Sequence, residues 1–335
     1  MPARNKHLIL VHGRSTKPSR DEKTRLVREV LEHGVSRASK SAAKALRNDK
    51  VRFSLAYYGD INNRILRERK HSSMRWLVAT DPAFDNAPCE APGSYDDNIA
   101  AILRRGPRDF TKRAYERWLG EVKSAPYIDD VASLASSIAN VLGLSERFVR
   151  NFSPDMSAYL TTRRAGSDIR RRLQTPLREA LLAGDDVCLV AHSMGCIVAY
   201  DVLWKFSRMS EYEDLHGKPV TRWITMGSPL GEPGVQGCLY DADERSDGRY
   251  PDNAALAWIN FAAHDDFVAH DERIADDFAD MRTRGLIRRI VDRPKIYNFY
   301  EGTQGGNPHK LYAYLNHPKV GAEIANWILA PSARG

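Results

Sequence analysis

The chain has 335 residues, of which 42% are hydrophobic and 28% are charged, and its formal net charge is +7. This composition predicts a globular protein with a full-sized core, most simply one domain with an insertion. The sequence contains no run of ~18 consecutive apolar residues, which a membrane-spanning helix requires, and no apolar leader with a cleavage site. We therefore expect a cytoplasmic protein.

Neither the basic residues nor the cysteines identify a partner. The basic residues are scattered over predicted helices and accompany no nucleic-acid motif, so we expect a solvated surface and no nucleic-acid partner. The cysteines lack the short paired spacing of a zinc site or of a disulfide framework; they are Cys89, Cys188, Cys196 and Cys238. We therefore expect no metal.

Apolar runs alternate with amphipathic segments, which predicts an α/β fold with a mostly parallel sheet and helices on both faces. The six predicted strands are 7–11, 52–58, 186–190, 221–226, 257–262 and 295–300. The predicted core helices are 21–48, 167–183, 194–208, 272–284 and 318–329. In such a sheet the functional residues gather at the carboxyl ends of the strands.

The first two predicted strands end in residues that suit the rim of a site. After the first strand, Gly13 permits a turn that presents the N–H of Arg14 toward the site, as half of an oxyanion hole. We expect Gly13 itself to contact substrate. After the second strand, Tyr58 either shapes the substrate pocket or packs within the protein, and we favour packing.

A long segment, 62–160, separates the second predicted strand from the next core helix and predicts a helical cap inserted between core segments 1–61 and 161–335. Helical patterns fall at 98–105, 109–123 and 128–144. The last is apolar at helical spacing and either covers an acyl pocket or packs as a surface helix. A basic rim beside an apolar cap would suit a phospholipid or an anionic acyl ester, and a peripheral contact with an anionic membrane.

The most informative motif is Ala191-His192-Ser193-Met194-Gly195, which links a predicted strand to a predicted helix. A serine on so sharp a turn has its hydroxyl pushed out of the sheet, and the positions two before and two after it must be small. Ser193 is therefore a candidate nucleophile. The N–H of Met194, at the positive end of the helix, is the second candidate oxyanion donor.

Two further strand ends supply an acid and a base. Asp265 and Asp266 follow the fifth predicted strand; we favour Asp266 as the partner of a histidine, while both could merely cap the next helix. A glycine-rich loop after the last predicted strand leads to His309, our candidate general base. His317 precedes Pro318 at a helix start and is interpreted as structural.

With the order Ser193, Asp266, His309, the chain resembles the α/β-hydrolase superfamily, and within it the bacterial lipase and esterase-like serine hydrolases. The residues that carry the resemblance are Leu8 to Gly13, the serine motif, Gly227-Ser228-Pro229, the Asp-Asp turn and the segment from His309 to Trp327. It covers residues 7–61 and 160–330. Ala191 departs from the more common glycine, and the sheet lacks the family's first strands.

The resemblance implies a parallel sheet, a Ser-His-Asp triad, and no metal or organic cofactor. We expect a serine hydrolase that cleaves a carboxylic ester through an acyl-enzyme, with His192, Ser228 and Pro229 lining the substrate site. The fold alone does not fix the substrate. An acyltransferase, a thioesterase, or an inactive binding protein that has kept the fold remain alternatives.

Overall fold

The six strands of the main sheet lie in the order β2-β1-β3-β4-β5-β6, and each neighbouring pair is parallel. The structure, a computed structural model, describes residues 4–14, 17–68, 94–122, 154–269, 271–302 and 305–331. The strands are β1 (Lys6–Val11), β2 (Val51–Ala56), β3 (Asp186–His192), β4 (Arg222–Met226), β5 (Ala257–Ala263) and β6 (Arg289–Ile296).

The winding of the sheet reverses between β1 and β3. The chain winds outward from β1 to β2, returns to β3 on the other side of β1, and then continues outward to β6. In open parallel sheets, ligands bind at the carboxyl ends of the strands where the winding reverses. Gly13 follows β1 and Ser193 follows β3, so this topology brings both residues to that position.

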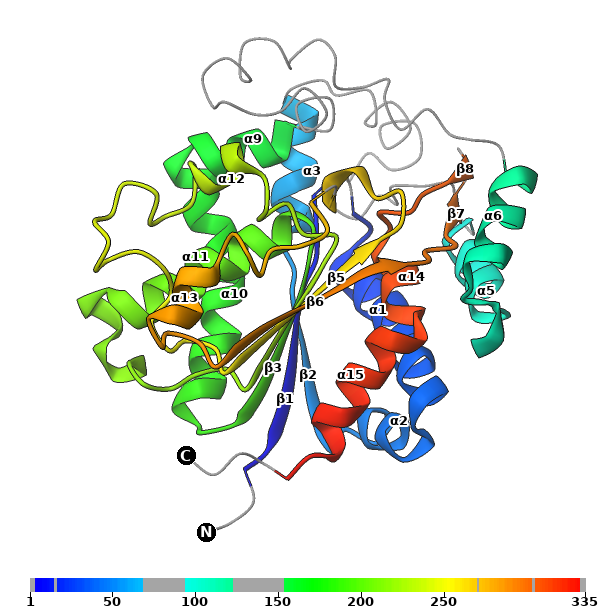
Figure 1. The fold of residues 1–335 in the computed structure, drawn as a ribbon, viewed down its shortest axis with the longest axis horizontal. Coiled ribbons are helices and arrows are strands. Elements are labelled where there is room, and N and C mark those ends of the chain that lie inside the picture. The colour runs from blue at the N-terminus through cyan, green and yellow to red at the C-terminus, as the bar shows by residue number, and fades with distance from the viewer. Residues whose placement is uncertain are drawn as a thin grey trace.

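Helices cover both faces of the sheet because the central strands are apolar on both sides. Within β1, Ile9 and Val11 join one core with α10 (Arg163–Leu182) and α11 (Met194–Arg208), whereas Leu8 and Leu10 join the other core with α1 (Arg20–Ala38) and α15 (Pro318–Leu329). Figure 1 shows α10 and α11 on one side of the strands and α1, α2 (Lys40–Arg47), α14 (Leu311–Asn316) and α15 on the other.

The remaining elements surround this core. They are α3 (Gly59–Glu68), α5 (Ser94–Leu103), α6 (Lys112–Glu121), α9 (Pro154–Thr161), α12 (Pro233–Gln236) and α13 (Ala279–Thr283), the 3-10 helices η1 (Pro107–Asp109), η2 (Ser210–Leu215) and η3 (Phe267–Ala269), and a small antiparallel pair, β7 (Glu301–Gly302) and β8 (Gly305–Gly306). Among the described residues, no helix is both long and apolar enough to cross a membrane.

Two glycines let α1 and α15 pack with their backbones in contact. A Cβ on Gly321 of α15 would lie 2.0 Å from the carbonyl oxygen of Gly34 in α1, and a Cβ on Gly34 would lie 2.0 Å from the carbonyl oxygen of Leu315. No side chain fits at either position without separating the helices. This contact fixes α14 and α15, which follow the loop that carries His309.

Five of the predicted strands are confirmed to within two residues, and the sixth is wrong. The strand predicted at 295–300 lies at 289–296. β6 is an edge strand with exposed positions, and its charged side chains hide it from a search for apolar runs. The apolar residues after it leave the sheet, and Phe299 packs against Tyr115 and Trp118 of α6.

Two of the predicted helices also have other bounds in the structure. The helix predicted at 21–48 is interrupted at Ser39, whose hydroxyl accepts the N–H of Ala42 and caps α2. The helix predicted at 272–284 shrinks to α13, because the carboxylate of Asp292 accepts the N–H groups of Ile274 and Ala275 and holds that segment outside a helix.

Described parts of the predicted cap contribute to the core: Ile99 and Ile102 of α5 join one core cluster, and Met156 and Tyr159 of α9 join the other. Two predicted helices, 98–105 and 109–123, overlap α5 and α6, whereas 128–144 lies outside the described residues. The predicted boundary after residue 61 falls within α3. Figure 1 shows α5 and α6 next to β7 and β8. A Cβ on Gly306 would lie 3.0 Å from the Trp118 ring, so α6 packs directly against the segment that precedes His309.

Candidate active site

Ser193 occupies the sharp turn between β3 and α11, with φ 57° and ψ −131°. A positive φ is unfavourable for a residue with a side chain, and the surrounding packing imposes it. The Ser193 N–H donates to the carbonyl of Met226 at 3.0 Å. At Gly195, a Cβ would lie 2.6 Å from the carbonyl oxygen of His12. The small residue two positions after Ser193 is therefore required by the closeness of β1.

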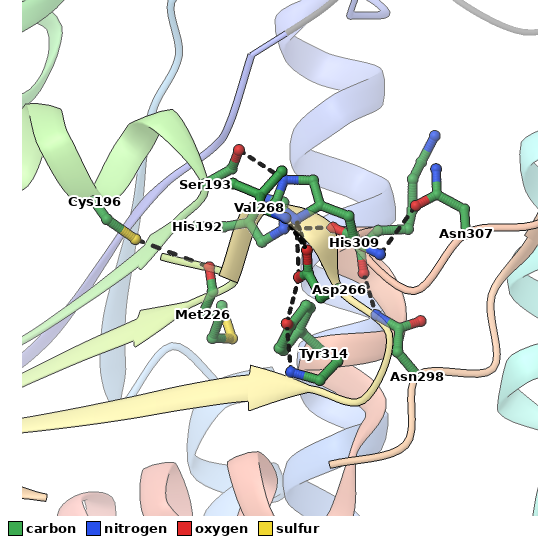
Figure 2. Close-up of polar contacts among 12 residues, drawn as sticks. His192, Ser193, Cys196, Met226, Asp266, Val268, Asn298, Asn307, His309 and Tyr314 are labelled. Carbon is green, nitrogen blue, oxygen red and sulfur yellow. Dashed lines mark hydrogen bonds and ion pairs between the residues drawn. The ribbon is translucent and has the colours of Figure 1, made fainter. Parts of the chain in front are cut away.

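The structure brings the three predicted side chains of the triad into one hydrogen-bonded row (Figure 2). His309 Nε2 lies 2.7 Å from Ser193 Oγ, and His309 Nδ1 lies 2.9 Å from both carboxylate oxygens of Asp266. A carboxylate only accepts hydrogen bonds, so Nδ1 carries the proton and Nε2 is free to accept one from the serine hydroxyl. All three residues are buried.

Two groups besides His309 donate hydrogen bonds to the Asp266 carboxylate. Tyr314 Oη donates to Asp266 Oδ2 at 2.6 Å, and the N–H of Val268 donates to Oδ1 at 3.0 Å. Tyr314 is itself fixed, since its oxygen accepts the N–H of Ala263 at 2.8 Å. Burial, with the Asp266 charge, raises the pKa of Tyr314 well above its usual value, so the phenol keeps the proton that it donates.

The geometry separates the alternatives that the sequence left open. Asp265 has φ 65° and a side chain that is 46% exposed, and its carboxylate lies 3.6 Å from His264. It is Asp266 that contacts His309. His317 caps α15 by accepting the N–H of Lys319 at 3.2 Å, which agrees with its structural interpretation.

The backbone of His309 is also fixed. Its N–H donates to Asn307 Oδ1 at 3.1 Å, and its carbonyl accepts His192 Nε2 at 2.7 Å. Burial is the main cause that lowers the pKa of His192 well below its ordinary value, so this ring is neutral and Nε2–H is its donor. His192, predicted to contact substrate, thus holds the backbone of the candidate base.

The other predicted substrate contacts have partners within the protein or are covered. Tyr58 is fully buried and donates to the carbonyl of His12. The Ser228 hydroxyl is buried and accepts the N–H of Leu230, and Pro229 is buried beside it. Gly13 lies directly beside the Ser193 side chain, because a Cβ there would be 2.7 Å from Ser193 Cβ and 3.2 Å from Oγ.

The candidate oxyanion hole follows from that closeness. The N–H of Arg14 belongs to the peptide that follows Gly13, whose carbonyl accepts His12 Nδ1 at 2.8 Å. In a trans peptide the N–H points opposite to the carbonyl, so the Arg14 N–H points away from the His12 ring. The N–H of Met194 begins α11, where the first N–H groups have no partner within the helix.

Cys196, the thiol nearest in sequence to Ser193, is not a competing nucleophile. It is fully buried, its sulfur lies 3.9 Å from the carbonyl oxygen of Met226, and burial raises its pKa to about 12. The residues that the structure describes also contain no group of three or more His, Cys, Asp or Glu side chains placed to hold a metal ion.

Sequence reasoning missed two residues of the site. Tyr314 lies in α14, which was not predicted, and nothing in the sequence around it indicates a contact with Asp266. His12 was noticed only as the neighbour of Gly13. The Nε2 atom of His12 accepts the N–H of Tyr58 at 3.0 Å. The one feature of the sequence that points to this contact is the position of His12 at the end of a predicted strand.

Comparisons with protein-family models, curated protein sequences and solved structures found no match to this chain.

Proposed function

We propose that this protein is a serine hydrolase with an α/β-hydrolase fold, which cleaves a carboxylic ester through an acyl-enzyme. The observation that carries the proposal is the row Ser193 Oγ, His309 and Asp266, with contacts of 2.7 and 2.9 Å, on a strained turn at the reversal point of the sheet. Strain at a buried turn is typical of functional sites, and the strand order is compatible with this fold.

The first half of the proposed reaction forms the acyl-enzyme. Ser193 Oγ bonds to the carbonyl carbon of the ester while His309 Nε2 takes the hydroxyl proton. The carbonyl π electrons move to oxygen, and the N–H groups of Met194 and Arg14 stabilise that oxyanion. As the carbonyl re-forms, the bond to the alcohol breaks and the alkoxide takes the proton from His309, leaving acyl-Ser193.

The second half uses water in place of the alcohol. His309 Nε2 takes a proton from a water molecule while the water oxygen bonds to the acyl carbon. The tetrahedral intermediate then expels Ser193 Oγ, which regains the proton, and the carboxylic acid is released. Asp266 stabilises the imidazolium in both halves and keeps Nδ1–H directed away from Ser193. A thiol ester, or an acceptor alcohol in place of water, would use the same steps.

The direct test is a panel of p-nitrophenyl esters of increasing chain length, with a phospholipid and a thioester alongside. Wild type should hydrolyse at least one substrate, and Ser193→Ala should reduce kcat by about 10⁴-fold or more. The chain-length profile identifies the acyl pocket, and activity on short chains alone would exclude a lipase. Equal rates for wild type and Ser193→Ala would refute Ser193 as the nucleophile.

A further inference from the structure

The backbone that carries the Arg14 N–H is held from both sides. The carbonyl before it, that of Gly13, accepts His12 Nδ1 at 2.8 Å. The carbonyl after it, that of Arg14 itself, accepts the ammonium group of Lys17. The carbonyl groups on both sides of the Arg14 N–H are therefore held by side chains. These two contacts together set the direction of that N–H.

Lys17 is itself fixed by α3. Its N–H donates to Asn63 Oδ1 and its carbonyl accepts Asn63 Nδ2, each at 2.9 Å. Gly59, at the start of the same helix, leaves room for the lysine, since a Cβ there would lie 2.5 Å from Lys17 Cβ. Both Lys17 and Asn63 are buried. The backbone of Lys17 is therefore fixed at a position from which its ammonium group contacts the Arg14 carbonyl.

The charge of Lys17 reaches the site. Burial is the main cause that lowers the pKa of His12, and the Lys17 charge is the next. The Lys17 charge is the smallest of several causes of the lowered pKa of His192, the residue before the nucleophile, where the charge of Lys23 contributes more. A fixed positive charge with low solvent exposure acts more strongly on developing negative charge than one in water.

We propose that Lys17 is a positioning residue for the oxyanion hole: it locks the Arg14 peptide in place and adds a positive charge behind it. The inference rests on the proposed function. As the ester carbonyl oxygen becomes an oxyanion, the locked Arg14 N–H meets it without reorganising, and the buried ammonium group stabilises the charge. Lys17 neither contacts the substrate nor transfers a proton.

The test compares Lys17→Met, which removes the donor and the charge, with Lys17→Arg, which keeps both. Lys6→Met is the matched control. Lys6 lies at the start of β1, at the opposite end of that strand from Gly13, and its ammonium group donates to the carbonyl of Trp327 and to Asp186 Oδ2, each at 2.8 Å. For each variant we would measure kcat and KM with the best p-nitrophenyl ester, the rate constant of inactivation by a fluorophosphonate, and the midpoint of thermal unfolding.

Lys17→Met should lower kcat and the inactivation rate constant by about 10- to 100-fold, while KM changes less than about threefold, because the lost interaction acts on the oxyanion. Lys17→Arg should recover most of the kcat. Lys6→Met should keep kcat within about threefold, even if its unfolding midpoint falls as far as that of Lys17→Met.

Two failures are distinguishable. If wild type is active and Lys17→Met loses no more kcat than Lys6→Met, or only raises KM, Lys17 has a structural role and the inference is wrong while the proposed function stands. If wild type neither hydrolyses any ester nor reacts with the fluorophosphonate, the proposed function fails and this inference fails with it.

Discussion

Asp266 accepts hydrogen bonds from His309, Tyr314 and the N–H of Val268, so its position is set by three separate groups. Asp265 is its exposed neighbour, with a side chain directed to His264. The two aspartates differ in environment although they are adjacent in sequence, because the positive φ of Asp265 turns the chain between them.

This difference predicts unequal effects of the same substitution. Asp266→Asn should lower kcat by about 10⁴-fold, because an amide cannot hold the His309 tautomer that accepts the serine proton. Asp265→Asn, the matched control, should stay within a few-fold of wild type. Steady-state ester hydrolysis measures both. A large loss in Asp265→Asn with normal activity in Asp266→Asn would show that the acid is misassigned.

Tyr314 should tune the triad without being essential to it. Tyr314→Phe removes the donor to Asp266 and leaves the buried N–H of Ala263 without its acceptor. We expect kcat to fall by about 3- to 30-fold and the free energy of unfolding to fall by about 1–3 kcal/mol, the usual cost of an unsatisfied buried group. Kinetics and urea denaturation test this, and no change in either would exclude the role given to Tyr314.

At the scale of single residues, the sequence predicted those that follow strands and little else. Ser193, Asp266 and His309 each stand in a short pattern at a predicted strand end. Tyr314 and Lys17 depend on where α14 and α3 pack, which no local pattern encodes. The contact of the His192 ring with the His309 carbonyl could not be predicted, because it depends on the path of the distant His309 loop.

Among the elements, apolar strands and helices with clear ends were predicted best. α11 and α15 begin and end as predicted, because each starts at a sharp turn or a proline and keeps an apolar face. β6 was misplaced because an edge strand tolerates charge on its exposed face. The prediction of a helix at 272–284 failed because a distant carboxylate, that of Asp292, binds two of its N–H groups.

The contact between α1 and α15 gives a prediction at this scale. Gly321→Ala should reduce the free energy of unfolding by about 2 kcal/mol or more, because the new methyl group would overlap the Gly34 carbonyl and force the helices apart. The control is Gly120→Ala in α6, where a Cβ meets nothing within 4 Å. That change should stabilise by about 0.5–1 kcal/mol through helix propensity. Chemical denaturation compares the two, and equal stability changes would contradict the close approach.

At the scale of the whole molecule, the sequence predicted the α/β class and the parallel sheet, since its apolar strands alternate with amphipathic segments. The strand order could not be derived from those patterns, because any order is compatible with them. That order makes β1 and β3 neighbours, so it also brings Gly13 beside Ser193.

Buried histidines make the stability of the molecule depend on pH. Burial lowers the pKa of His7, His12, His192 and His317. Below about pH 6.5 the unfolded chain binds protons at these groups and the folded protein does not, so stability falls with pH. Asp201 acts in the opposite sense, because burial raises its pKa to about 6 and the folded protein takes up that proton first.

His317 allows a single-site test of this effect. Its pKa is lowered to about 3, so its contribution is present above pH 6.5 and is lost progressively as pH falls toward 3. His317→Asn keeps an acceptor for the cap of α15 and removes the titration. Between pH 7 and 5, the variant should lose less stability than wild type by up to about 2 kcal/mol. Urea denaturation at both pH values measures this, and parallel losses would contradict the neutral buried state of His317.

The most direct measurement of the central claim, that Ser193 is an activated nucleophile, is mass spectrometry of the protein after reaction with a fluorophosphonate. Wild type should gain one adduct, located on the peptide that contains Ser193. Ser193→Ala should gain none, and His309→Ala should react at least about 10³-fold more slowly. An adduct on another residue, or an equal rate in wild type and His309→Ala, would contradict the mechanism proposed for this site.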